Sequence, residues 1–257
     1  MDALITAGGP MPEALAHLSQ QPYKCLLEFG GHRLIDTAVT AAHDASRVDR
    51  VCVVGPEAIR ASVDLRPGDL WVEDRGSGPA NLLAGLEALS GADQVLFVAS
   101  DVPFVTAAGL DDLVARSPAD KGFVLPIFRR EEVEARLPQA TNKYVPLKEG
   151  DLTASSVMVM SARLIAQHRD RVEFVFGARK HFAKLFGMIG PMTAVRFALS
   201  MKFGWRIMDV PSLEAAIARL MGFPVAAIFG CDAAFTFDID HERDYAECEQ
   251  LLATLGE

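Results

Sequence analysis

The sequence lacks three features that would each identify a class of protein. No apolar run reaches the ~18 uncharged residues of a membrane-spanning helix. No basic segment followed by an apolar stretch opens the chain, so we expect no secretory signal and a cytoplasmic protein. The four cysteines form no Cys-x-x-Cys pair, which favours reduced thiols over a structural zinc site.

Positive charge is scarce as well. The 25 Lys and Arg are outnumbered by 34 Asp and Glu, and the formal net charge of −9 argues against nucleic acid as a partner. The charge is unevenly spread, however. Residues 163–206 hold nine Lys or Arg against two acids, so this segment carries +7 and the remainder −16.

Short apolar runs alternate with segments of helical period, which is typical of parallel β-α-β units. In the first half, strands are expected at 3–7, 51–55, 70–73 and 94–99, and helices at 34–43, 81–89 and 110–115. In the second half, strands are expected at 123–128, 156–160, 225–229 and 234–239, and a closing helix at 241–252. Residues 129–151 look charged and turn-rich. The pattern predicts a Rossmann-like α/β protein with a mostly parallel sheet, in one domain over 1–257.

A glycine pair ends the first expected strand. Ala7 is followed by Gly8 and Gly9, and Lys24 comes later in the loop. Glycines let backbone N–H groups approach phosphate oxygens, and a lysine can neutralise a triphosphate. The alternative is an ordinary glycine turn with a solvated lysine, because a Gly-Gly pair alone is a weak signal.

A carboxylate ends the most hydrophobic strand, in the sequence Ser100-Asp101 before a Val-Pro-Phe run. Ligands of open parallel sheets bind outside the carboxyl ends of the strands. An aspartate there is well placed to hold Mg²⁺, which prefers a few carboxylates together with substrate phosphates. Capping of the turn before the proline is the alternative role for Asp101.

Two further acids, Asp238 and Asp240, end a late strand-like run. They would project to the same side if the strand continues through both, and could complete a metal site. Alternatively, Asp240 caps the last helix.

The turn after the third expected strand is rich in small residues. It contains Asp74, Gly76, Ser77, Gly78 and Asn81, and small residues there let a flat base lie against the backbone. A plain β-to-α loop is an equally good interpretation.

Together these motifs resemble, in their order, the MobA-like NTP transferases, a nucleotidyltransferase group with a GT-A-like fold. The resemblance covers residues 3–106 and 234–245. It rests on Lys24 within KCLLEFGG, Asp101 within DVPFVT, and Asp238 and Asp240 within DIDHERDY. It implies a three-layer sandwich in which 1–120 is a nucleotide-binding half and 121–257 an acceptor half with a basic helical insertion at about 161–222.

The resemblance also implies a reaction and a set of site residues. An acceptor phosphate or hydroxyl attacks the α-phosphorus of an NTP and expels pyrophosphate, with Mg²⁺ (or Mn²⁺) on Asp101 and on Asp238 or Asp240. Lys24 and Asp101 are the expected catalytic residues. The expected nucleotide contacts are Ala7, Gly8, Gly9, Lys24, Asp74, Gly76, Ser77, Gly78, Asn81 and Ser100.

The chain departs from the family pattern in two places. Residues 10–23 form a longer loop with no Arg or Lys before Lys24, and residues 122–224 match no known acceptor-binding region. This places the chain in an uncharacterised branch. Within the second segment, Arg179, Lys180 and Lys184 are expected to meet a phosphorylated or lipid-linked acceptor, or an anionic membrane. Core helices with solvated lysines are the alternative.

Two other functions fit the same motifs. A GT-A glycosyltransferase would use the fold and metal on a nucleotide sugar, although the glycine pair and lysine suit a triphosphate better. A non-catalytic nucleotide-binding protein would keep the fold without turnover.

Overall fold

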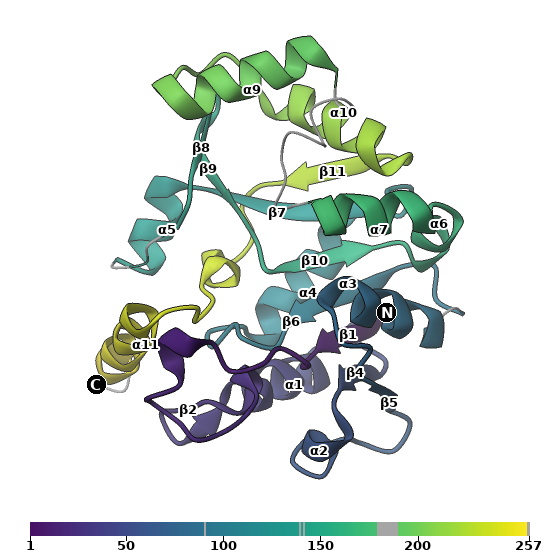
Figure 1. The fold of residues 1–257 in the computed structure, drawn as a ribbon, viewed down its shortest axis with the longest axis vertical. Helices are drawn as coiled ribbons and strands as arrows, with labels where there is room; N and C mark the ends of the chain where they lie inside the picture. Colours follow the sequence, from purple (N-terminus) through teal and green to yellow (C-terminus); the bar gives the residue numbers. More distant parts are fainter. Residues whose placement is uncertain (90, 139, 141, 179–189, 256–257) are drawn as a thin grey trace.

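The computed structural model describes residues 1–257 except 90, 139, 141, 179–189 and 256–257 (Figure 1). A nine-stranded sheet forms its centre. The strands of this sheet are β1 (Asp2–Thr6), β4 (Val51–Gly55), β5 (Leu70–Glu73), β6 (Val95–Ala99), β7 (Phe123–Arg129), β8 (Val145–Leu147), β9 (Gly150–Ala154), β10 (Val157–Met160) and β11 (Val225–Ile228). Their order is β5-β4-β1-β6-β10-β7-β9-β8, with β11 paired to β7.

Helices surround the sheet. They are α1 (Leu34–Asp44), α2 (Glu57–Arg60), α3 (Gly78–Ala88), α4 (Ala107–Arg116), α5 (Arg130–Arg136), α6 (Ala162–Gln167), α7 (Arg169–Ala178), α9 (Pro191–Phe203), α10 (Val210–Met221) and α11 (Glu242–Leu255). Short 3-10 turns occur at η1 (Glu13–Leu15), η2 (Lys24–Leu26) and η3 (Ala233–Thr236), and β2 (Glu28–Phe29) pairs with β3 (His32–Arg33). None of the helices in the described part is long and apolar enough to cross a membrane.

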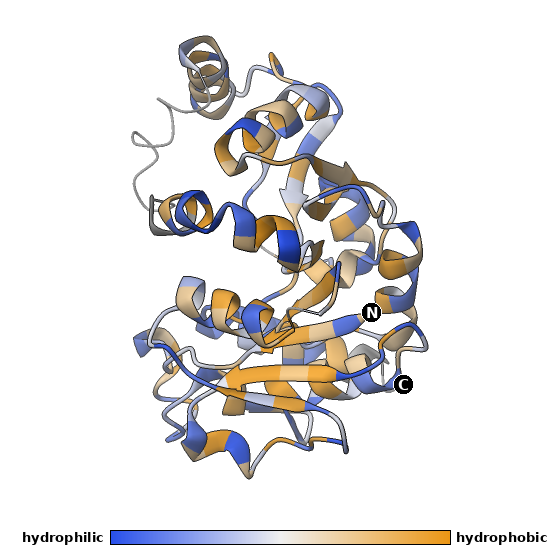
Figure 2. Ribbon diagram, turned by 90° about the vertical axis from the view of Figure 1, so that its right-hand side faces the viewer, coloured by the Kyte–Doolittle hydropathy of each residue, from blue (hydrophilic) through white to orange (hydrophobic). Residues whose placement is uncertain are grey.

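The first half of the sheet is parallel and covered on both faces. β1 pairs in parallel with β4 and β6, and β4 with β5. Leu4 packs in one apolar cluster with residues of α3, while Ile5 packs in another with residues of α1 and α4. Apolar side chains on both faces explain the continuous hydrophobic runs of these strands, which stand out in Figure 2. The expected three-layer, Rossmann-like arrangement is confirmed.

Beyond β6 the sheet becomes mixed. β10 runs antiparallel between β6 and β7, and β9 runs antiparallel to β7. Among the described residues, all remaining strands of the sheet run in the same direction as β1. The β8–β9 ribbon rises from the sheet towards α9, which lies at one end of the long axis of the molecule (Figure 1).

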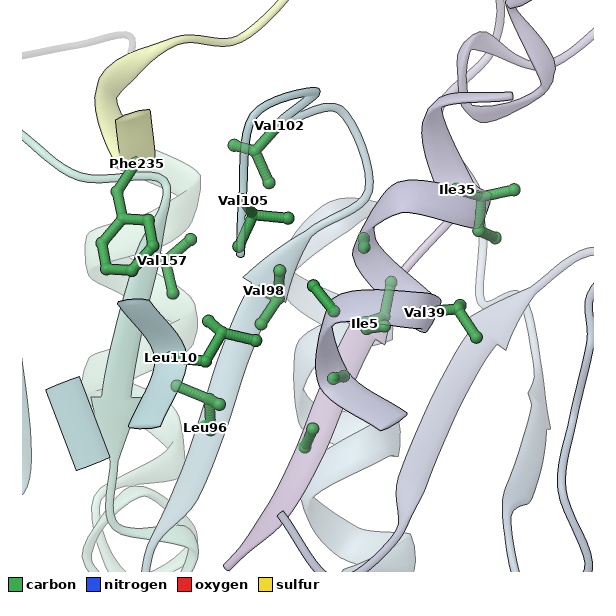
Figure 3. Packing of buried hydrophobic residues seen from close by; sticks show 14 of the residues in the cluster. Ile5, Ile35, Val39, Leu96, Val98, Val102, Val105, Leu110, Val157 and Phe235 are labelled. Atoms are coloured by element: carbon green, nitrogen blue, oxygen red, sulfur yellow. The ribbon is translucent and has the colours of Figure 1, made fainter. Parts of the chain in front are cut away.

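Two expectations about local structure were wrong. Residues 129–151 are not merely turns, because they contain α5, β8 and the start of β9. Residues 234–239 do not form a strand: Asp232 accepts a hydrogen bond from Ala234 N and starts η3. Phe235 then fills a fully buried space beside Val157 (Figure 3). Tertiary packing of one aromatic ring thus overrides the strand-like apolar run.

Candidate active site

Lys24 is brought to the carboxyl end of β1 by a loop that folds back on itself. Residues 10 and 23 form an isolated antiparallel bridge, and Lys24 N donates a hydrogen bond to Gly9 O at 3.1 Å. The length of the 10–23 loop, unusual for the family pattern, therefore does not move the lysine away from the glycines. η2 then carries the Lys24 side chain into the protein, where only 11% of it is exposed.

The Lys24 ammonium bridges two carboxylates. Its Nζ lies 2.5 Å from Asp101 Oδ2 and 2.5 Å from Asp240 Oδ1. Burial alone would lower the pKa of Lys24, but the charges and hydrogen bonds of the two aspartates outweigh burial and raise it above the usual value. The lysine is therefore fully charged in the site.

Asp101, Asp238 and Asp240 form a cluster whose ligand oxygens all lie within 4.8 Å of one another. Burial raises the pKa of Asp238 to about 6, and the neighbouring charges of Asp101 and Asp240 act in the same direction. Three carboxylates this close, with one lysine to offset them, have the chemistry of a site for a hard divalent cation.

The backbone between the two late aspartates explains why both reach the cluster. Phe237 and Ile239 are buried in the apolar cluster beside α11, so Asp238 and Asp240 alternate to the opposite side of an extended segment. Asp240 does not cap the last helix. Asp244 Oδ2 instead accepts hydrogen bonds from the N–H groups of Asp240 and His241, at 3.0 and 2.7 Å.

A cavity of about 340 Å³ lies beside this cluster at the carboxyl ends of the parallel strands. Three segments that were predicted separately from the sequence meet here: the glycine pair with Lys24, the turn at 76–81, and Ser100 with Asp101. Its lining consists of Thr6, Gly8, Gly9, Pro10, Lys24, Cys25, Gly76, Ser77, Gly78, Asn81, Ala99, Ser100 and Asp101. Its size is that of a small-molecule site.

Of the expected nucleotide contacts, Ala7 and Asp74 do not line this cavity, and Asn81 lines it while its side chain is engaged in the cavity wall. Ala7 is fully buried, and its carbonyl accepts a hydrogen bond from the Cys25 thiol. Asn81 Oδ1 accepts from Arg75 N at 2.7 Å, while Nδ2 donates to Asp74 Oδ1 at 2.5 Å. The side-chain amide of Asn81 is thus used at both ends to hold the turn at 74–81.

Gly8 is required by close packing against that turn. A Cβ at Gly8 would collide with the Asp74 carboxylate and would come within 2.8 Å of Asn81 Nδ2. A Cβ at Gly9 would meet nothing within 4 Å. The two glycines therefore have different roles: Gly8 lets two loops meet, and Gly9 leaves the cavity open.

A second cavity, of about 260 Å³, lies on the other side of the carboxylates. Asp238 and Asp240 line it together with Asn142, Lys143, Thr153, Ser156, His241 and Arg243, among others. Neither Lys143 nor Arg243 was predicted from the sequence as an acceptor contact. The basic residues predicted for that role, Arg179, Lys180 and Lys184, lie outside the described residues.

A larger cavity, of about 680 Å³, lies at the opposite, amino-terminal ends of β1 and β6, beside Asp2 and Gln94. It is remote from the carboxylate cluster. Because ligands of such sheets bind at the carboxyl ends of the strands, size alone does not make it the active site.

Nucleotidyltransferases are the class of enzyme that this fold and this strand-end site define. The chain belongs to one family of them, since the MobA-like NTP transferase domain matches residues 4–188. It is therefore an enzyme of the nucleotidyltransferase class, as the resemblance in the sequence implied.

Individual solved structures share the fold. The structure is similar to a hypothetical transferase from Thermus thermophilus, with a TM-score of 0.80 and 23% identity over 95% of this chain and 100% of that one. It is also similar to 4-diphosphocytidyl-2C-methyl-D-erythritol synthase from Anaerococcus prevotii, with a TM-score of 0.58 and 12% identity over 98% and 95% of the two chains. At these identities the likeness shows the fold alone.

A curated relative matches a shorter segment. The bifunctional protein GlmU of Acidithiobacillus ferrooxidans is 30% identical over 98 residues, which span 37% of this chain and 22% of that protein. The alignment thus covers about a fifth of the length of the relative.

Proposed function

We propose that this enzyme transfers a nucleoside monophosphate from an NTP to a phosphorylated acceptor, releases pyrophosphate, and requires Mg²⁺ (or Mn²⁺). One observation carries the proposal: the carboxylate cluster lies between two cavities. Asp101 lines the first cavity, and Asp238 and Asp240 line the second. In a group transfer between two bound substrates, the reacting atoms lie where the two binding cavities meet.

The first cavity suits the NTP. The backbone at Gly8 and Gly9 is free of side chains and can approach the triphosphate, while Ser77 and Gly78 offer a flat surface for the base. Lys24 supplies positive charge between the phosphates and the carboxylates. In this chemistry, positioning and charge neutralisation provide most of the rate.

The three carboxylates fit a divalent cation, because carboxylate oxygens are the ligands that Mg²⁺ prefers. We assign the metal to Asp101 with Asp238 or Asp240. When bound, the metal would neutralise the charge that develops on the reacting phosphates. Lys24 now occupies the space between Asp101 and Asp240, so its ammonium must turn towards the phosphates once a metal is held there.

The second cavity suits the acceptor. Lys143 and Arg243 place two cations within reach of an acceptor phosphate, next to Asp238. An acceptor oxygen held there forms the new bond to the α-phosphorus. The bond from that phosphorus to the α–β bridging oxygen breaks, and pyrophosphate leaves on the side of Gly8 and Gly9.

The test is pyrophosphate release, measured with each of the four NTPs, Mg²⁺ and a panel of sugar phosphates and polyol phosphates. We expect release with one NTP and one class of acceptor. Release of a nucleoside diphosphate from a nucleotide sugar would instead support a glycosyltransferase. Stabilisation by an NTP without turnover on any acceptor would support a nucleotide-binding protein.

A double variant tests the assignment of the acceptor to the second cavity. Changing Lys143→Gln and Arg243→Gln together should raise the acceptor KM roughly tenfold and leave the NTP KM unchanged, because charge-assisted hydrogen bonds to the acceptor phosphate are lost. Arg47→Gln with Arg60→Gln, which removes two charges from exposed residues that line neither cavity, is the matched control. An unchanged acceptor KM would remove the acceptor from this cavity.

A further inference from the structure

Helix α9 is apolar on the side that faces solvent as well as on the side that faces the protein. Its inner residues, such as Ala194 and Phe197, pack against apolar clusters beneath it. The exposed apolar side chains of this region are Met192 (65%), Val195 (54%), Met201 (49%), Phe203 (52%) and, just beyond the helix, Trp205 (54%). A helix with apolar residues all round is normally covered all round. An exposed apolar face of this kind is typical of a contact surface.

The charge of the face identifies what covers it. Arg196 and Lys202 lie on the exposed part of α9, and neither forms an ion pair with a carboxylate in the part of the chain that the structure describes. The sequence from 174 to 208 contains no Asp or Glu, although the whole chain has 34. A basic and apolar face, to which this stretch of the sequence contributes no acid, is complementary to an anionic partner on a protein of net charge −9.

The aromatic residues at the end of α9 have the character of a lipid-interface anchor. Gly204 adopts a left-handed conformation (φ 69°) that ends the helix and turns the chain back. Phe203 and Trp205 consequently stack, with ring centroids 5.0 Å apart and an interplanar angle of 27°, while both stay half exposed. The Lys202 ammonium lies 5.4 Å from the Phe203 ring centroid. Amphipathic aromatic rings beside lysines are typical of segments that rest in the headgroup region.

The position of α9 allows contact with a flat surface. The helix lies at one end of the long axis, away from both chain termini, in Figure 1 and again after a 90° turn in Figure 2. A second copy of the chain fits less well than a lipid surface. An isologous dimer through this face would bring Arg196 and Lys202 of both copies into one interface, and like charges there oppose association.

We propose that the α9 face, defined as Met192, Val195, Arg196, Met201, Lys202, Phe203 and Trp205, docks on an anionic lipid surface. The contact is peripheral: apolar side chains enter the headgroup region and the cations pair with lipid phosphates. It does not depend on the proposed reaction, because none of these residues lines either cavity at the carboxylates.

The test uses the full chain and vesicles of two compositions, phosphatidylcholine alone and an equimolar mixture with phosphatidylglycerol. We expect co-sedimentation with the mixed vesicles at low salt, little with phosphatidylcholine, and loss of binding at high salt. Arg196→Gln with Lys202→Gln should weaken the partition roughly 30-fold, given the usual contribution of each cation near such a surface. Phe203→Ser with Trp205→Ser should weaken it by a similar factor.

The matched control is Arg47→Gln with Arg60→Gln, which makes the same change in net charge on exposed residues remote from α9. It should bind vesicles like the parent chain. Equal loss of binding in the control and in the α9 variant would mean that net charge, and not this face, attracts the lipid, and the proposal would fail.

A second readout reports on the face directly. The chain has two tryptophans, and Trp71 is half-buried with an indole N–H that has no hydrogen-bond partner among the described residues, so Trp71→Phe should fold normally and leave Trp205 as the single emitter. We expect a blue shift of Trp205 emission on adding mixed vesicles. No shift and no co-sedimentation would overturn the proposal. So would a dimer, measured by light scattering, that Phe203→Ser with Trp205→Ser dissociates.

Discussion

The two cavities that meet at the carboxylates are built in different ways. The cavity beside Gly8 and Gly9 is lined by segments that follow the parallel strands β1, β5 and β6, and four of its lining residues are glycines. The cavity beside Asp238 is lined by residues of β9, η3 and the start of α11, together with residues 140, 142 and 143. In the proposed function, the triphosphate meets glycine backbone and one lysine, whereas the acceptor meets side chains from several separate segments.

The two cavities also differ in the residues that supply their positive charge. Lys24 is the cation among the described residues lining the first cavity, and two carboxylates hold it. Lys143 and Arg243 reach the second cavity from separate segments, opposite Asp238 and Asp240. Variants on either side of the carboxylates should therefore affect one substrate at a time, and variants of the carboxylates should affect both.

The largest effect is expected from Asp101→Asn. Losing this carboxylate removes a proposed metal ligand and one partner of Lys24, so turnover should fall on the order of 10²–10³-fold. The fold should survive, because an amide of the same shape replaces a partly exposed group. Pyrophosphate release at saturating Mg²⁺ and NTP gives the rate, and a thermal melt checks the fold. Turnover close to that of the parent chain would end the assignment of metal to Asp101.

Gly8→Ala tests whether the nucleotide side depends on close backbone packing. The added methyl group collides with Asp74, so we expect a loss of about 1–3 kcal/mol in the free energy of unfolding. Gly9→Ala is the matched control, since its methyl group has open space, and its stability should match that of the parent chain. Chemical denaturation of the three proteins is the measurement. Equal stabilities would show that the contact with Asp74 relaxes without cost.

Lys24→Met should change two affinities in opposite directions. Without the ammonium between Asp101 and Asp240, Mn²⁺ binding to the nucleotide-free protein should strengthen, because a competing cation is gone. NTP binding should weaken about tenfold, the usual scale for losing a charged hydrogen bond to a phosphate. Calorimetric titrations of Mn²⁺ and of NTP separate the two effects. If both affinities fell, the lysine would support the carboxylates instead of competing for them.

The same contrast explains what the sequence could predict. Gly8, Gly9 and Asp101 follow apolar strands directly, and the ends of parallel strands gather at one edge, so their convergence follows from local pattern. Asp238 and Asp240 were expected on one side of a strand. They do share a side, but because Phe237 and Ile239 are buried and not because a strand forms. The predicted alternation of side-chain directions is therefore present at residues 237–240, although the predicted strand is not.

The residues of the proposed acceptor cavity could not be predicted from local sequence pattern. Lys143 lies in a loop whose position depends on β8 and β9, and those strands were missed because residues 129–151 are short of apolar runs. Arg243 lies in the first turn of α11 and reaches the cavity only because Asp244 binds the backbone at Asp240 and His241. The Asp244 contacts are local, but the approach of this turn to Lys143 and β9 joins segments far apart in the sequence, which no local pattern encodes.

Asp238→Asn should reveal a pH dependence in the metal-free protein. The pKa of Asp238 is about 6, above its ordinary value of 3.8, so the folded protein holds this proton more tightly than the unfolded chain. Its contribution to stability is therefore largest at low pH and is lost as pH rises from about 4 to about 6.

At pH 7 in EDTA, Asp238→Asn should be more stable than the parent chain by about 1–2 kcal/mol, and the gap should close by pH 4. Urea unfolding across this range is the measurement, with the exposed Asp64→Asn as the control. A gap that stayed constant with pH would mean that Asp238 is not the group that titrates.

The smallest effect is expected from Cys25, although it lines the nucleotide cavity beside Lys24. Its thiol is buried and donates to Ala7 O at 3.3 Å, and burial raises its pKa to about 12. The thiolate is the reactive form, so Cys25 should resist iodoacetamide at pH 8, in contrast to a low-pKa catalytic cysteine. Cys25→Ala should cost less than about 1 kcal/mol, because a thiol is a weak donor, and should leave pyrophosphate release unchanged. Peptide mapping after alkylation and a turnover assay test both points. Rapid labelling of Cys25, or a large loss of turnover in Cys25→Ala, would show that the Cys25 side chain takes part in the reaction, whereas we infer only a structural role for it.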